Sequence, residues 1–356
     1  MGIAAAPHVS VELAGSGASP ATTSVPDEHV ITILIERDVD MPDTAAVTLS
    51  NANDLYTRTG LATTITIRAG DGADRTVIFS GEIISLEPTY RGGAGTRVVV
   101  RAMNRMHRML RKRRSLTYTD KTDRDIVAQL AKDAGLDLAW RHDTTLTHAH
   151  VYQHAQSDLD FVRERAARLG CHVWCIGTTL HVEQPTFSDE LPIKLSVDEA
   201  SANAQLRSFA PRMSAATVVH KVTVRGWNPE TKELITGEAT ASRSPLGTTT
   251  AVAAAGAAGS EDTVTVDQPI WSREEATALA RARLQQALLG FITGDAELTG
   301  NPHVDLAKVV SITANAADKQ DPFNGKYYIH GVTHRVAGGS YTTALRLWRD
   351  AQGAAS

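Results

Sequence analysis

Residues 156–184 read QSDLDFVRERAARLGCHVWCIGTTLHVEQ and predict one compact local unit. Ser157 and, three residues later, Asp160 have the spacing of a helix N-cap with a reciprocal acidic partner. Apolar residues then recur at helical spacing, and Gly170 stands where a left-handed residue commonly ends a helix. The apolar positions are Leu159, Val162, Ala166 and Leu169.

The residues after this predicted helix change from helical to alternating periodicity, which is typical of a strand. Cys171, Val173 and Cys175 fall on one side of that strand. Residues 177–179 (GTT) can turn the chain, and residues 180–183 (LHVE) can return as a second strand. The stretch therefore predicts a capped helix that leads into a β-hairpin.

The same order of signals occurs once earlier in the chain. Thr122 and Asp125 have the spacing of a helix cap, an apolar face follows, and Gly135 precedes residues 136–140 (LDLAW), which predict a strand. The apolar face consists of Ile126, Val127, Leu130, Ala131 and Ala134. Two copies of helix, glycine stop and strand predict an α/β insert in the middle of the chain.

Short strands are predicted on both sides of this insert. Residues 8–102 contain several short apolar or alternating runs with glycine-rich turns, a pattern typical of a barrel or a sandwich. A second strand-rich region begins near Ile193 and includes residues 217–227 and 325–348. Within the latter, a change of phase at residues 330–331 (HG) predicts a β-bulge.

Two segments of the second region do not have the pattern of strands. Residues 238–262 are rich in Ala, Gly, Ser and Thr, which bury little apolar surface, so we expect a flexible loop. Ser272 and Glu275 then have the spacing of a capping box, and Gly290 follows the apolar stripe behind it. These signals predict a helix over residues 272–289.

The composition of the 356-residue chain is that of an ordinary soluble globular protein, with 42% hydrophobic and 21% charged residues. The formal net charge of −4 argues against a general nucleic-acid-binding protein, and no sequence-specific nucleic-acid binding is expected. No apolar run approaches the roughly 18 residues of a membrane span, and residues 1–10 lack the pattern of a secretory signal. We therefore expect folding in the bacterial cytoplasm, without a direct membrane anchor.

The two cysteines and the large apolar side chains are expected to lie in the interior. Cys171 and Cys175 would be about 13 Å apart on one strand, beyond the limit of about 7 Å for a disulfide, so both are expected to be reduced. The residues assigned to the core, with no further role, are Leu159, Phe161, Val162, Trp174, Tyr327, Ile329 and Leu345.

Residues 105–114 form the densest basic run in the chain. It ends in Arg111, Lys112, Arg113 and Arg114. Such a run can contact a phosphate backbone, or it can meet an acidic patch on a neighbouring subunit. The negative net charge favours the second alternative, so these four residues are the candidate partner or subunit contact.

Four histidines, His142, His148, His150 and His154, lie close together in the sequence. Histidine is a common metal ligand, and His148 and His150 would share one face of a strand. No cysteine lies among them, so we assign no metal ligand there, although a metal site remains an alternative.

Six short motifs occur in a characteristic order along nearly the whole chain. With them the chain resembles the phage late control gene D family, which comprises baseplate hub proteins of contractile tails and the hub portion of VgrG-like spike proteins. The motifs are residues 79–83 (FSGEI), 122–136, 153–170, 222–229 (VTVRGWNP), 325–334 (GKYYIHGVTH) and 341–343 (YTT). Residues 306–308 (LAK) depart from the family, which tends to carry a glycine there, so the resemblance does not define this loop.

The resemblance implies a mainly β fold with an α+β insertion, in which two tail-tube-like β-barrels are joined by a helix/hairpin insert. The implied domains are residues 1–114 for the first barrel and 115–190 for the insert. Residues 191–350 would form the second barrel, with the loop 238–262 and the helix 272–289, and residues 351–356 would form a tail.

The resemblance also implies a role as a structural homotrimer, a symmetry adaptor between a sixfold tail tube and a threefold spike. Its partners would be a spike trimer, a tail tube or tube-initiator protein and baseplate wedge proteins, with the tape-measure protein as a further candidate. VgrG-like proteins continue into a spike, whereas this sequence stops at Ser356, so the spike is expected to be a separate chain. The implied location is the baseplate of a virion tail or injection particle, and the runner-up is a hub or tail-tip protein of a non-contractile tail.

The sequence predicts no enzyme, no cofactor and no catalytic residue. It contains no nucleophile elbow, no HExxH helix, no P-loop and no dinucleotide-binding fingerprint. Asp38, Asp40 and Asp43 do not match a calcium loop. Carboxylate pairs for glycoside cleavage converge only in space, so a cell-wall hydrolase at the tail tip is an open alternative.

Overall fold

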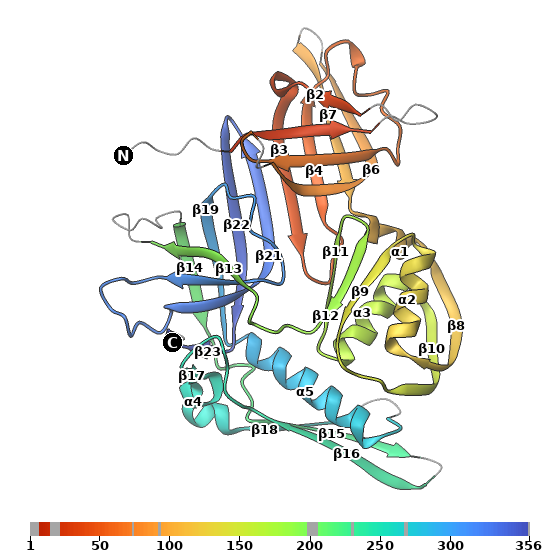
Figure 1. Ribbon diagram of the computed structural model, residues 1–356, viewed down its shortest axis with the longest axis vertical. Helices are drawn as coiled ribbons and strands as arrows, with labels where there is room; N and C mark the ends of the chain where they lie inside the picture. Colours follow the sequence, from red (N-terminus) through yellow and green to blue (C-terminus); the bar gives the residue numbers. More distant parts are fainter. Residues whose placement is uncertain are drawn as a thin grey trace.

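The computed structural model describes residues 7–14, 22–72, 75–91, 94–197, 206–228, 231–266 and 270–354. The chain in these ranges is mainly strand with a few helices (Figure 1), which confirms the predicted mainly β fold with an α/β insertion. Figure 1 shows the first strand-rich half at the top, the insert at the right, and the second half below and to the left.

The first half contributes antiparallel strands to one large sheet, in the order β3-β4-β7-β6-β5-β1-β2. The strands are β1 (Val9–Leu13), β2 (Thr23–Val25), β3 (Val30–Asp38), β4 (Thr44–Ser50), β5 (Thr64–Ala69), β6 (Thr76–Arg91) and β7 (Ala94–Met103), with short 3-10 turns η1 (Asp27–His29) and η2 (Ala52–Asp54). Alternate residues such as Ile65, Ile67 and Ala69 are buried, as the period of a strand requires. Side chains from both ends of this strand order contact one hydrophobic core, so the sheet curves around it.

The second half continues the same sheet. Its strands are β13 (Glu190–Ser196), β14 (Leu206–Met213), β19 (Ile292–Thr299), β20 (Val309–Thr313), β21 (Gly325–Ala337) and β22 (Ser340–Arg349). The order β14-β19-β22-β21 leads directly to β3 of the first half, and β20 pairs with β21 and β13. These strands enclose a second hydrophobic core.

The structure differs from the prediction of two β-barrels, because no closed barrel is found among the described residues. β3 is paired with β4 on one side and with β21 on the other, from Thr32 opposite Ala337 to Asp38 opposite Gly331. Both edges of β3 are therefore occupied, and β3 cannot also pair with β2 to close the first half. The result is one continuous sheet that curves around two separate cores.

The insert confirms the two predicted units of helix, glycine stop and strand. It contains β8 (Arg113–Thr122), α2 (Asp123–Asp133), β9 (Asp137–Arg141), β10 (Thr147–Ser157), α3 (Asp158–Arg168), β11 (His172–Ile176) and β12 (Thr179–Glu183). Thr122 and Ser157 cap the two helices. Gly135 and Gly170 follow the helices with φ of 72° and 69°.

The strands of the insert form a small sheet and a ribbon. β11 and β12 form the predicted hairpin, and β9 pairs in parallel with β12, so the two repeated units share the sheet β11-β12-β9. β8 and β10 form a separate two-stranded ribbon. The basic segment before β8 folds as η3 (Arg105–His107) and α1 (Arg108–Arg111), in which Met106 and Met109 are buried while Leu110 is exposed.

A second small sheet branches off between β14 and β19. Its order is β16-β15-β18, with β15 (Lys221–Asn228), β16 (Glu233–Thr240) and β18 (Asp262–Val266), and helix α5 (Arg273–Leu289) packs on it. Ser272 accepts a hydrogen bond from the Glu275 amide, which confirms the predicted N-cap. The Glu275 carboxylate accepts from the amide of Trp271 instead of Ser272, so the reciprocal half of the capping box is shifted by one residue.

The segment predicted as a flexible loop, residues 238–262, has regular structure over much of its length. It contains the end of β16, β17 (Thr249–Thr250), α4 (Ala251–Ala255) and the 3-10 turn η4 (Gly256–Ser260), and β17 pairs with β23 (Ala351–Gln352). The loop prediction was wrong because a few side chains suffice to order the segment. Leu246 and Ala251 are fully buried, and Thr250 caps α4.

The core predictions are confirmed. The seven residues assigned to the core are all buried: Leu159, Phe161, Val162, Trp174, Tyr327, Ile329 and Leu345. Cys171 and Cys175 are free and buried, and burial raises the pKa of each thiol to about 12. The register of β21 shifts between Ile329 and Gly331, which confirms the predicted bulge.

Candidate functional site

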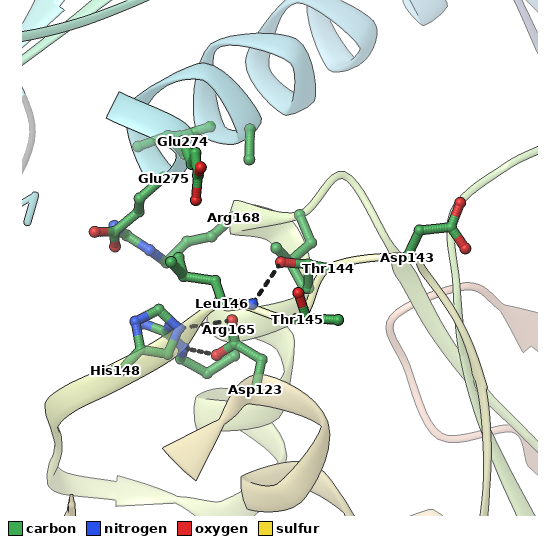
Figure 2. Close-up of a pocket in the computed structure, with 13 residues that line it drawn as sticks. Asp123, Asp143, Thr144, Thr145, Leu146, His148, Arg165, Arg168, Glu274 and Glu275 are labelled. Atoms are coloured by element: carbon green, nitrogen blue, oxygen red, sulfur yellow. Dashed lines mark hydrogen bonds and ion pairs between the residues drawn. The ribbon is translucent and has the colours of Figure 1, made fainter. Parts of the chain in front are cut away.

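A cleft of about 310 Å³ lies between the insert and helix α5, and Figure 2 shows its lining. Thr144, Thr145 and Leu146 come from the loop between β9 and β10, and Glu274 and Glu275 come from the first turn of α5. The cleft therefore marks the place where two segments far apart in the sequence face each other.

The base of the cleft carries three buried polar side chains from three elements of the insert. The Arg165 Nε donates to Asp123 Oδ1 at 2.5 Å. His148 Nε2 lies 3.1 Å from Asp123 Oδ2 and 2.9 Å from Arg165 Nη2. Burial alone raises the pKa of Asp123, but the His148 hydrogen bond and the Arg165 charge outweigh it, so this pKa is lowered. Asp123 is therefore an ionised partner of Arg165 at neutral pH.

One ion pair spans the cleft. Arg168 Nη2 donates to Glu275 Oε1 at 2.8 Å, which links α3 of the insert to α5. The charged side chains at the base and across the cleft thus bind one another. The Asp123 carboxylate lies beside the His148 imidazole and is paired with Arg165, so these contacts hold three elements of the insert together.

The predicted contact residues extend from the last residue of α1 to the start of β8, and they differ in whether their side chains have partners within the chain. Arg111 and Lys112 are exposed, and their side chains make no hydrogen bond or ion pair with the part of the chain that the structure describes, although the Lys112 carbonyl accepts from the Asp158 amide. Arg113 is exposed, but its guanidinium donates to the Ala155 carbonyl. Arg114 is bound within the insert, where its Nη2 lies 2.7 Å from the buried Asp158.

The four histidines named from the sequence do not converge on one point. His148 is buried against Asp123, and His142 Nδ1 accepts from the Thr144 amide. His150 and His154 are exposed on β10. Within the described ranges, no group of three or more His, Cys, Asp or Glu side chains has the arrangement of a metal site.

Sequence reasoning missed a joint where the two halves and the insert meet. The Asp40 amide donates to the Val173 carbonyl at 2.6 Å, and the Val173 amide donates to the Asp40 carboxylate at 2.8 Å. His172 Nδ1 lies 2.7 Å from the Tyr328 hydroxyl. Aspartates 38 and 40 were visible as a cluster in the sequence, but no local signal identified partners more than 130 residues away.

A comparison with known families gives a match over most of the chain. The family described as the Alg8 N-terminal domain matches residues 30–338. The chain belongs to this family. No curated protein matches the sequence.

Solved structures share the fold at low sequence identity. The 43 kDa tail protein of prophage MuSo2 from Shewanella oneidensis is 12% identical, with a TM-score of 0.69 over 97% of this chain and 100% of that chain. A tail protein from Neisseria meningitidis is 11% identical, with a TM-score of 0.71 over 96% and 97% of the two chains. An Escherichia coli component of the type VI secretion system is 13% identical, with a TM-score of 0.60 over 95% and 76%.

These likenesses confirm that this member of the Alg8 N-terminal domain family has the fold of phage tail proteins and of a type VI secretion component. The described residues include no helix that is both long enough and apolar enough to cross a membrane.

Proposed function

We propose that this protein is a structural hub of a contractile tail or tail-like injection particle, where three copies join a sixfold tube to a threefold spike. The observation that carries the proposal is the fold match to the prophage MuSo2 tail protein, which spans nearly all of both chains. The gene D family resemblance of the sequence motifs agrees with it.

The architecture gives this proposal a physical basis. Each chain contains two strand-rich halves with separate cores, joined edge to edge through β3 and β21. Three copies around one axis would present six such halves, which is what a threefold adaptor to a sixfold tube requires. Rings of this kind form when a head-to-tail interface closes on rotation. We retain residues 1–114, 115–190 and 191–350 as the proposed domains, followed by the tail 351–356.

The proposed partners are a spike trimer, a tail tube or tube-initiator protein, baseplate wedge proteins and the tape-measure protein. The basic run offers a contact for one of them or for the neighbouring subunit, because Arg111 and Lys112 are exposed and unpaired within the described chain. The proposed role is structural and not catalytic, and the proposed location is the baseplate of an assembled particle. The mutual pairing of charges in the cleft of Figure 2 supports this role over a tail-tip hydrolase.

Co-purification with the product of the neighbouring spike gene tests the proposal. A hub should co-elute with the spike protein in equimolar amounts, as a complex of three chains of each. Release of cell-wall fragments by the purified protein, without any spike association, would instead establish the hydrolase alternative.

A further inference from the structure

The outer face of the β8–β10 ribbon carries a row of exposed rings. Along β10, His150, Tyr152 and His154 alternate with the buried Val151 and Gln153, so the three rings share the side that faces away from the core of the insert. Tyr152 is 55% exposed, and its ring centroid lies 5.6 Å from that of His154. We call His150, Tyr152 and His154 the ring ladder.

The neighbouring strand adds small polar side chains beside the ladder. Thr119 lies opposite His150, and Thr117 lies opposite Tyr152. Both threonines are exposed. The ladder is therefore open to a ligand along its length, and no bulky side chain of β8 covers it.

Basic residues stand at one end of the ladder. Arg113 begins β8 at the His154 end, next to the exposed Arg111 and Lys112. Asp120 is the one acidic residue in the sequence of the two strands. The ribbon is thus locally basic in a protein whose formal net charge is −4.

We propose that the ladder face binds single-stranded nucleic acid without sequence preference. Rings at alternate strand positions are about 6.6 Å apart, roughly twice the 3.4 Å spacing of stacked nucleotides, so bases separated from one another can each lie on a ring. Base-on-ring stacking combined with flanking Lys and Arg is how non-specific single-strand sites work. In a duplex the base faces are covered, so the ladder discriminates against it.

Both the charge and the shape of the ladder face favour single-stranded nucleic acid as its ligand. The phosphate backbone complements Arg111, Lys112 and Arg113, and the ring faces complement the bases. The ladder has no side chain in a fixed hydrogen-bonded position that reads a base edge, which leaves the site without sequence specificity. This activity goes beyond the proposed hub function and does not depend on it.

Fluorescence anisotropy with a labelled oligothymidine of about 16 nucleotides tests the proposal. The wild type should bind at low salt, and Tyr152→Ala should weaken binding about tenfold, within the range of one lost stacking contact. Tyr90→Ala is the matched control, because Tyr90 is 64% exposed on the first half of the chain. Arg111→Gln combined with Lys112→Gln should lower the salt slope by about 1.4, since each cation contributes about 0.7 on a single strand.

Three results would overturn the proposal. They are the absence of oligothymidine binding at low salt, equal affinity of the wild type and Tyr152→Ala, or equal affinity for a duplex of the same length. A Tyr152→Ala protein that keeps its affinity but loses subunits in solution would identify the ladder as a protein contact.

Discussion

Arg346 of β22 donates a hydrogen bond to Asp38 at the end of β3, although 308 residues separate the two in the sequence. The same carboxylate lies 2.8 Å from His330 Nδ1. Asp38 therefore ties the first half to two strands of the second, at one end of the β3–β21 pairing.

Replacing Asp38 with Ala should weaken this joint. Because Arg346 is more than half exposed, we expect a loss of only about 1 kcal/mol in the free energy of unfolding, measured by urea denaturation. Glu36→Ala is the matched control, an exposed carboxylate on the same strand with no ion pair to another described residue. Equal stabilities of the two variants would show that the Asp38 contacts add nothing to the joint.

We expect the residues of the basic run to differ in role, with Arg111 and Lys112 acting in assembly and Arg114 in stability. Reversing Arg111 and Lys112 to Glu should weaken subunit or partner association without lowering the melting temperature, because neither side chain is paired within the described chain. Arg58→Glu together with Lys319→Glu is the control at exposed basic sites elsewhere. Unchanged assembly in the first variant would remove the run from the candidate contacts.

Arg114 should behave in the opposite way. Its replacement by Gln leaves the buried Asp158 without its cation, so we expect the insert to lose about 3 kcal/mol. Analytical ultracentrifugation of the folded fraction should still give the wild-type mass. A stable Arg114→Gln protein with an altered mass would show that Arg114 acts in assembly and not in the stability of the insert.

The base of the cleft makes a second stability prediction. Asp123→Asn keeps the shape of the side chain but leaves the buried Arg165 without a counter-charge, so it should cost about 3 kcal/mol in the free energy of unfolding. Asp143→Asn, at an exposed position in the wall of the same cleft, should cost nothing measurable. Similar melting curves for both variants would contradict a structural role of Asp123.

The buried His172 should make the stability of the fold depend on pH. Burial lowers its pKa to about 3, compared with about 6.5 in the unfolded chain. The unfolded state therefore binds the proton more tightly, and stability is lost as the pH falls from about 6.5 toward about 3. His172→Gln should reduce the slope in this window by up to about 1.4 kcal/mol per pH unit. An unchanged slope in His172→Gln would mean that His172 is accessible to protons in the folded state.

We expect the substitution Ala307→Gly to stabilise the fold. Its φ of 59° is left-handed, and this conformation costs a residue with a Cβ about 1 kcal/mol or more. Ala307→Gly should raise the free energy of unfolding by about 1 kcal/mol, while Ala317→Gly, in an exposed turn without a positive φ, should not. A loss of stability in Ala307→Gly would show that unfolded-state entropy outweighs the strain.

Local features of this fold could be predicted from the sequence because their causes are local. Thr122, Ser157 and Ser272 cap helices through amides three residues away, and Gly170 ends α3 with a positive φ. The bulge before Gly331 and the hairpin of β11 and β12 likewise depend on residues within a short stretch.

Long-range pairing could not be predicted in the same way. The partner of β3 is chosen among many apolar strands by the whole fold, so the continuous sheet replaced the two expected barrels. The order in residues 238–262 depends on Leu246 and Ala251 reaching cores formed elsewhere in the chain. The cluster of Asp123, His148 and Arg165 is likewise assembled from three elements, and no local signal connects the three residues.

The most direct test of the hub account is the molar mass of the purified protein in solution, measured by light scattering over a range of concentrations. The account predicts a species with three times the chain mass, which dissociates when the subunit contact is disrupted. A monomer at every concentration, or a closed dimer, would contradict a threefold adaptor.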